Sequence, residues 1–280
     1  MSSWSANGSR VRAQPPHLTE SQRQLLMEAG IGFIDLAGNA HVEAQGVYIS
    51  KVSPKPSRPH NIAAPNLFSD KASLVVRELL SRRDPVGVLE LAAKIGVTPG
   101  YVSKVLSRLD SLGYLSRDQE QKVTLRDPKS LLQDWAAVHD YTKNRMTGYF
   151  CRAPGVEAIL DKLERAVASE GYALTAQAGA HLVDPYAAFD RVDIYVSSLR
   201  ATEALAAALG LEPVDKGANV VLWEPYLRHS VFFGCHEVRG VRVVSDIQLY
   251  LDLVKYPVRR AEQAEHLYRL LLRPLFEPSV

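Results

Sequence analysis

The chain has 280 residues, of which 46% are hydrophobic, and its 33 Lys and Arg against 31 Asp and Glu leave a formal net charge of +2. Such a chain can bury a sizeable core in two or three domains, and any affinity for nucleic acid must come from local clusters of charge. It has no uncharged run of the ~18 residues that a membrane helix requires, no apolar signal stretch at its start and no Cys-x-x-Cys pair. These features argue against a membrane protein, a disulfide scaffold and a zinc ribbon, and we expect a cytoplasmic protein.

The N-terminal part predicts a tail, a small module and a linker. Residues 1–17 contain Ser, Arg and Pro with little to bury, which is typical of a disordered tail. Residues 18–52 predict a helix followed by short strands with glycines at the turns, and therefore a small α+β module. Residues 53–68 carry several prolines between basic side chains and predict an extended linker.

Two carboxylates of the small module could bind a divalent metal. Asp35 and the Glu43 of Glu43-Ala44-Gln45 resemble the acidic pair in nucleases of the restriction-enzyme type. However, Asp is also common before turns because it hydrogen-bonds locally, and Glu43 fits the solvent face of a strand. The module is too short for a complete nuclease core, so a metal-dependent nuclease is the alternative and not the main interpretation.

Residues 69–128 predict three helices followed by a two-stranded wing. Ser69 can cap the first helix, and the second, over residues 88–95, ends at Gly96, which favours the left-handed conformation of a helix end. Thr98-Pro99 begins the third helix with a cap residue and a proline, which is well tolerated at the first helical position. Helix, tight turn and helix is the helix-turn-helix arrangement, in which the later helix lies in the DNA major groove.

The outer face of the third helix and the wing carry side chains that can bond phosphates or base edges. The candidate DNA-binding residues are Thr98, Tyr101, Ser103, Lys104, Ser107, Arg108, Arg117, Lys122 and Arg126. The segment resembles the winged helix-turn-helix domains of bacterial transcription regulators, and this resemblance implies that it binds double-stranded DNA. The open alternative is a three-helix unit that only packs against the rest of the chain or contacts another protein.

The remaining residues predict a connector and an α/β domain. Residues 129–147 follow an Asp-Pro pair and begin with apolar residues at helical spacing, which predicts a connector helix. Residues 148–280 alternate strands with helices, including strands at 231–235 and 238–244, and so predict a domain with a central sheet. Because the segments on either side of the connector can each bury an apolar face, we expect two separable domains.

The last domain resembles a degenerate nucleotidyltransferase fold. Residues 171–178 (GYALTAQA) and 191–196 (RVDIYV) look like the segments in which these enzymes hold a triphosphate and bind metals through two carboxylates. The two carboxylates must occupy alternate strand positions so that they share a face. Here Tyr195 stands where the partner of Asp193 should be. The resemblance therefore implies a catalytically inactive domain, with a residual transferase as an enzyme alternative.

The winged helix, residues 30–40 (GIGFIDLAGNA), the strand end at 172–175 (YALT) and residues 244–253 (VSDIQLYLDL) together resemble AbiEi-type antitoxins of type IV toxin–antitoxin systems. The resemblance implies a DNA-binding part that represses its own operon. It implies a C-terminal domain that counters a nucleotidyltransferase-like toxin, through the toxin or its target, and it allows a homodimer. We expect no enzyme activity, cofactor or metal, no membrane partner, and an α+β fold class made of the three parts described above.

His229, Cys235 and His236 also have the chemistry of metal ligands. The last two are adjacent, so on a strand they would point to opposite faces. An ordinary structural role is therefore the expectation for all three.

Overall fold

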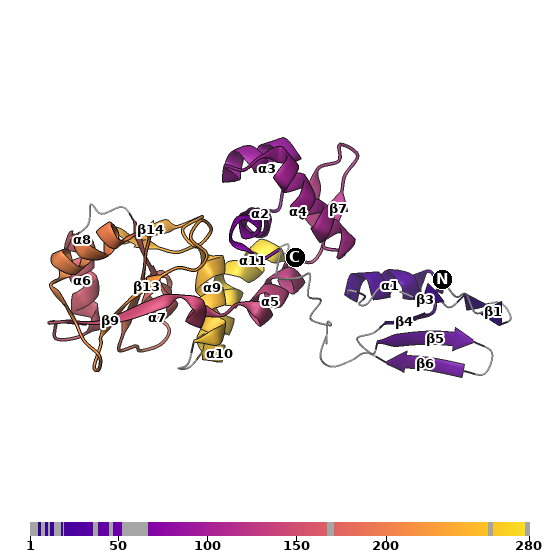
Figure 1. The fold of residues 1–280 in the computed structure, drawn as a ribbon. Helices are drawn as coiled ribbons and strands as arrows, with labels where there is room; N and C mark the ends of the chain where they lie inside the picture. The colour runs from indigo at the N-terminus through magenta and orange to yellow at the C-terminus, as the bar shows by residue number, and fades with distance from the viewer. Residues whose placement is uncertain are drawn as a thin grey trace. The chain divides into compact units, whose positions relative to one another are not determined.

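The structure is a computed structural model that describes residues 5–6, 9–10, 12–13, 18, 20–35, 39–44, 47–51, 67–166, 171–256 and 260–277 (Figure 1). The chain divides into two compact units, Met1–Ala64 and Pro65–Val280. Both units contain helices and strands, in agreement with the predicted α+β class. Most of the predicted linker lies outside the described residues.

The first unit has a short helix and a four-stranded sheet with the order β3-β4-β5-β6. Its elements are α1 (Glu20–Glu28), β3 (Arg12–Ala13), β4 (Phe33–Ile34), β5 (Ala40–Ala44) and β6 (Val47–Lys51), with a separate pair β1 (Ser5–Ala6) and β2 (Ser9–Arg10). The helix and the strands from β4 to β6 lie where the sequence predicts them.

The predicted tail differs from expectation in its described residues. β1, β2 and β3 fall within residues 1–17, where we expected no regular structure, and β3 pairs in parallel with β4. Strand pairing satisfies backbone groups and needs no apolar side chains, so composition alone could not indicate it.

The second unit begins with three helices and a two-stranded sheet. These are α2 (Asp70–Leu80), α3 (Val88–Ile95), α4 (Pro99–Ser111), β7 (Leu115–Arg117) and β8 (Val123–Leu125). α3 ends at Gly96, whose φ of 69° is left-handed, and α4 begins with Pro99 after Thr98. Val86 extends the small sheet, because its N–H and C=O bond to Val123 at 3.0 and 2.9 Å. The local signals in the sequence predicted the bounds of α3 and α4 correctly.

The rest of the second unit is built on a seven-stranded sheet with the order β12-β9-β13-β11-β10-β15-β14. Its strands are β9 (Arg145–Cys151), β10 (Tyr172–Thr175), β11 (Val192–Val196), β12 (Leu211–Pro213), β13 (Val220–Glu224), β14 (His236–Val238) and β15 (Val241–Val243). β11 is parallel to β13 and β10 is parallel to β15, whereas the other neighbours are antiparallel. Every residue of β10 and β11 is buried, which requires cover on both faces of the sheet.

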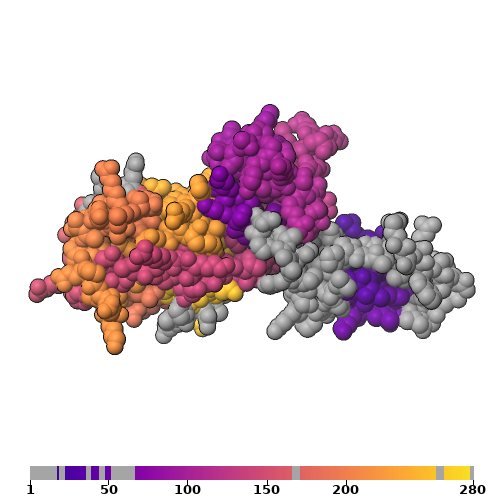
Figure 2. All heavy atoms as spheres, viewed as in Figure 1, coloured from indigo at the N-terminus to yellow at the C-terminus, as the bar shows by residue number. Residues whose placement is uncertain are grey.

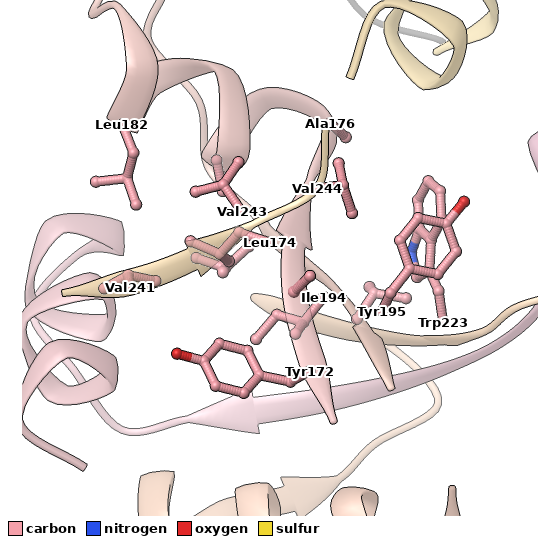
Figure 3. Packing of buried hydrophobic residues seen from close by; sticks show 14 of the residues in the cluster. Tyr172, Leu174, Ala176, Leu182, Ile194, Tyr195, Trp223, Val241, Val243 and Val244 are labelled. Atoms are coloured by element: carbon pink, nitrogen blue, oxygen red, sulfur yellow. The ribbon is translucent and has the colours of Figure 1, made fainter. Parts of the chain in front are cut away.

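Helices provide this cover: α6 (Val156–Ala166), α7 (Ala176–Val183), α8 (Leu199–Leu209), α9 (Asp246–Lys255) and α10 (Arg260–Leu267) bury side chains in the core around the sheet. The other C-terminal helices are α5 (Pro128–Val138), the 3-10 helix η2 (Tyr141–Lys143), the π-helix η3 (Tyr268–Leu272) and α11 (Arg273–Phe276). α6 packs with α8, and α7 packs with α9. Figure 3 shows part of the core, where Leu174, Ile194 and Val243 from three neighbouring strands lie among other buried apolar side chains.

The strand prediction for residues 231–235 is wrong. The N–H of Phe233 bonds to the C=O of Ser230 at 3.1 Å, and the N–H of Cys235 bonds to the C=O of Phe232 at 3.3 Å, so the segment forms turns. Gly234 has a φ of 77°, which a strand does not allow. An apolar run can be buried in a turn as well as in a strand, and hydropathy does not distinguish the two.

The helices from α2 to α4 share one core with the C-terminal elements. Its buried members include Leu79, Leu91 and Leu106 from these helices, and Ile247 and Leu272 from α9 and η3. Figure 2 shows the purple surface of the former meeting the orange and yellow surface of the latter. The expected division at residues 128 and 148 therefore does not coincide with a break in packing.

Candidate nucleic-acid interface and the buried carboxylates

The outer face of α4 is polar and accessible. Its inner face is held in the core by Val102, Leu106 and Leu109, none of which is more than 1% exposed. The outer side chains predicted to contact DNA lie together on this helix: Thr98, Ser103, Lys104 and Ser107 are exposed, and Tyr101 and Arg108 are half-buried. The structure thus places these candidates on one surface.

Lys104 and Arg108 are available to a ligand. Within the part of the chain that the structure describes, no carboxylate oxygen lies within 4.0 Å of their charged nitrogens. Arg126, which follows β8, is also exposed and without such an ion pair among those residues. These cations could approach phosphates without first breaking an internal contact.

The wing is less basic than the sequence suggested. Arg117 lies 3.5 Å from Asp110, and Lys122 lies 2.7 Å from Glu120. The hydrogen bond to Glu120 raises the pKa of Lys122. At the same turn, the Asp118 carboxylate accepts the backbone N–H groups of Glu120 and Lys122. Asp110 lies on α4 and Arg117 on β7, so counting cations along the wing could not reveal this pair.

A stripe of polar side chains on α2 contacts the C-terminal part. Asp70 accepts the backbone N–H groups of His229 and Ser230 at 2.9 to 3.0 Å, and its carboxylate lies 2.6 Å from Nδ1 of His229. One turn further along, Oγ of Ser73 donates to Oγ of Ser230 at 2.8 Å. Together with Arg77, Asp70 and Ser73 form what we call the α2 polar stripe.

Arg77 is only 1% exposed. It donates from Nη2 to Oε1 of Gln248, and its guanidinium carbon lies 4.7 Å from the ring centre of Trp135. Nε and Nη1 have no hydrogen-bond partner among the described residues. Burial lowers the pKa of Arg77 to about 10, although Asp252 opposes the shift. The side chain is still a cation at neutral pH, so its burial requires a negative charge nearby.

Asp252 on α9 supplies that charge and is completely buried. Its carboxylate accepts Nε2 of Gln248 at 2.8 Å, Oγ1 of Thr175 at 2.6 Å and the hydroxyl of Tyr195 at 3.3 Å. Nε2 of His139 lies 2.9 Å from the same carboxylate. Both oxygens therefore have protein partners, and this carboxylate is enclosed by donors.

Asp193, the carboxylate expected from the transferase resemblance, is enclosed in the same way. It accepts Nε1 of Trp223 at 3.0 Å and the hydroxyl of Tyr256 at 2.5 Å, and Nη2 of Arg191 lies 3.0 Å away. Burial raises the pKa of Asp193, and Arg191 opposes this effect. Tyr195, two positions along β11, shares its face of the sheet and joins the hydrogen bonds around the other carboxylate.

The sequence did not indicate that Arg77 and Asp252 belong to one buried polar centre. Both side chains lie on helices whose neighbouring apolar residues are buried, such as Val76 beside Arg77 and Leu253 beside Asp252. A charge within such a run signals a buried partner, because an unpaired buried charge is very costly. The identity of the partner depends on tertiary contacts.

The turn after β10 uses small residues for packing. Ala176 adopts a left-handed φ of 49°, at a cost of ~1–2 kcal/mol. Gly179 permits the close approach of α7 to α9, since a Cβ there would lie 2.7 Å from Cδ2 of Leu249. Gly179, directly after the segment that resembles a triphosphate loop, therefore has a packing role.

The metal-site candidates do not converge. In the described ranges, no group of three or more His, Cys, Asp or Glu side chains could hold a metal ion. Asp35 is buried and accepts the N–H of Leu18 and both amide groups of Asn39 at 2.8 to 3.1 Å, as expected for local hydrogen bonding. Glu43 is exposed, and the two histidines pair with different carboxylates: Nε2 of His236 lies 3.9 Å from Asp246, and Nδ1 of His229 lies 2.6 Å from Asp70.

The comparison with protein families gives the class of the protein. Residues 124–272 match the family model described as "Transcriptional regulator, AbiEi antitoxin, Type IV TA system". The match covers more than half of the chain, which therefore belongs to this antitoxin family, as its motifs indicated. It begins in β8, so the helices from α2 to α4 precede it. No curated protein and no solved structure matches the chain.

Among the described residues, no helix combines the length and the apolar character needed to cross a membrane.

Proposed function

We propose that this antitoxin-family regulator binds a specific DNA operator through α4 as the recognition helix of a winged helix-turn-helix domain. The observation that carries the proposal is the exposed polar face of α4, with Lys104 and Arg108 free of ion pairs among the described residues. The bond of Val86 to Val123 supports the proposal, because it ties the start of α3 to the small sheet. The predicted partner is double-stranded DNA at the promoter of its own operon.

Not all candidate residues are expected to contribute equally. Ser103, Lys104 and Ser107 on α4, with Thr98 just before the helix, are exposed and can reach a groove, whereas Tyr101 and Arg108 are half-buried. In the wing, Arg117 is already paired with Asp110 and Lys122 with Glu120, so the net attraction of these two cations for phosphate is smaller. A homodimer that engages two half-sites would give the usual geometry of such regulators.

The C-terminal domain is proposed to act by binding and not by catalysis. Asp193 is enclosed by Trp223, Tyr256 and Arg191, and a metal would have to displace these contacts. Tyr195 supplies no second carboxylate. We therefore propose that this domain counters a nucleotidyltransferase-like toxin, or shields its target, without enzyme activity of its own.

The test is a titration of the promoter fragment with Lys104→Ala, Arg108→Ala protein. We expect a large loss of affinity and a reduction of the salt slope by about 1 for each phosphate contact removed. Arg200→Ala, Lys216→Ala is the matched control, because it removes the same charge from exposed positions of the C-terminal domain. A folded Lys104→Ala, Arg108→Ala protein that binds as tightly as wild type would falsify the proposed interface.

A further inference from the structure

The α2 polar stripe contacts two segments of the C-terminal domain. Asp70, Ser73 and Arg77 follow one another at spacings of three and four, and therefore lie on one face. The first two contact the turn at His229 and Ser230, and the third contacts Gln248 on α9. One helix face is thus bonded to two C-terminal segments.

Other faces of the same helix pack on the candidate DNA-binding helices. Val75, Val76 and Leu79 are buried in the core that also contains Leu91 of α3 and Leu106 of α4. α2 contacts both α3 and α4. Because close-packed helices transmit displacement, a change in how α2 sits on α9 also changes the placement of α4.

Gln248 joins two opposite buried charges. Its Oε1 accepts Arg77, and its Nε2 donates to Asp252 at 2.8 Å. The amide of Gln248 is therefore oriented by both contacts. A rotation of this amide by 180° would place its NH₂ group against the Arg77 guanidinium and its oxygen against the Asp252 carboxylate. Arg77 and Asp252 are both fully buried, and the amide of Gln248 bridges their opposite charges.

We propose that Arg77 is a positioning residue for the DNA-binding helix and acts through Gln248 and Asp252. The three residues form a relay by which the polar centre of the C-terminal domain sets the placement of α4. Operator affinity therefore depends on side chains that never touch DNA. By linkage, DNA binding stabilises the same centre on α9. This inference rests on the proposed DNA-binding function.

The first test is the operator affinity of full-length Arg77→Met and Gln248→Met proteins, measured where each is folded. We expect binding to be about five- to tenfold weaker than wild type, the lower range of a coupling between sites. Glu78→Gln is the matched control, since Glu78 is the next residue of α2 and pairs with Arg82 of the same segment, not with the C-terminal domain. Its affinity should remain that of wild type.

The second test is hydrogen exchange, because a purely structural role would lower stability without linking the two sites. In wild type, the promoter duplex should slow amide exchange in α9 at residues 246–255 as well as in α4. In Gln248→Met this remote protection should be lost, while protection of α4 remains at saturating DNA. Gln248→Met keeps the test decisive if Arg77→Met does not fold.

The two proposals fail in different ways. If Lys104→Ala, Arg108→Ala protein binds the duplex normally, the proposed DNA interface is wrong. If that variant loses binding but folded Gln248→Met binds like wild type and α9 shows no protection, only the relay is overturned. If Gln248→Met binds the duplex more weakly and also loses the DNA-induced protection of α9 against amide exchange, the relay is supported.

Discussion

Oγ of Ser73 donates a hydrogen bond of 2.8 Å to Oγ of Ser230, and 157 positions separate these two fully buried residues. The contact joins α2 to the turn after β13. Around it, α2 is buried among α3, α4, α9 and η3. The first helix of the proposed DNA-binding domain is therefore also an internal element of the C-terminal structure.

We predict that a fragment of residues 65–126 does not fold cooperatively. It would lose the cover that Ile247, Leu251, Tyr268 and Leu272 provide to the shared core, which is worth on the order of 5 kcal/mol or more. Thermal unfolding followed by circular dichroism checks this, with residues 65–280 as the control. A fragment that melts cooperatively at the temperature of the control would show that the two parts are separable, as the sequence had suggested.

We predict that the wing cations matter less than those of α4. Arg117→Ala and Lys122→Ala should each weaken promoter binding less than Lys104→Ala, because Asp110 and Glu120 already offset the wing charges. Exposed ion pairs of this kind are worth only ~0–1 kcal/mol, so neither variant should lose its fold. The measurement is the same DNA titration at two salt concentrations. A larger loss from either wing variant would mean that the ion pairs open on DNA and that the wing is a main contact.

The stability difference between wild type and Asp193→Asn should depend on pH. Burial raises the pKa of Asp193 above its unfolded value, so this group favours the folded state below the unfolded pKa and loses that contribution as pH rises through the folded pKa. Relative to Asp193→Asn, wild type should therefore gain stability as pH is lowered from 7 to 4. Urea unfolding at both pH values tests the sign. The opposite trend would show that the Arg191 pair outweighs burial.

We predict that the purified protein transfers no nucleotide in Mg²⁺ or Mn²⁺. The physical reason is that the oxygens of Asp193 are occupied by protein donors and Tyr195 provides no metal ligand. Labelled nucleotides with RNA or protein acceptors provide the assay. Labelling that disappears in Asp193→Ala would establish a transferase. Plasmid cleavage lost in Asp35→Ala or Glu43→Ala would establish the nuclease alternative.

Much of the local structure could be predicted from the sequence, because its signals act over a few residues. Gly96 ends α3 because its φ is positive, and Thr98 with Pro99 begins α4 because the first helical N–H needs no partner. The apolar spacing of Val102, Leu106 and Leu109 identified the inner face of α4, and hence its polar outer face. These are properties of backbone conformation and helical periodicity.

Tertiary structure alone decided which charges are free and which are paired. Lys104 and Arg117 are both predicted DNA contacts, but only Arg117 has a carboxylate nearby, that of Asp110 on α4 at 3.5 Å. Arg77 has helix-forming character like any surface Arg, yet it is buried against Gln248 because α2 lies between two parts of the fold. Electrostatic interactions depend on distance in space and on burial, and distant segments bring those charges together only when the chain folds.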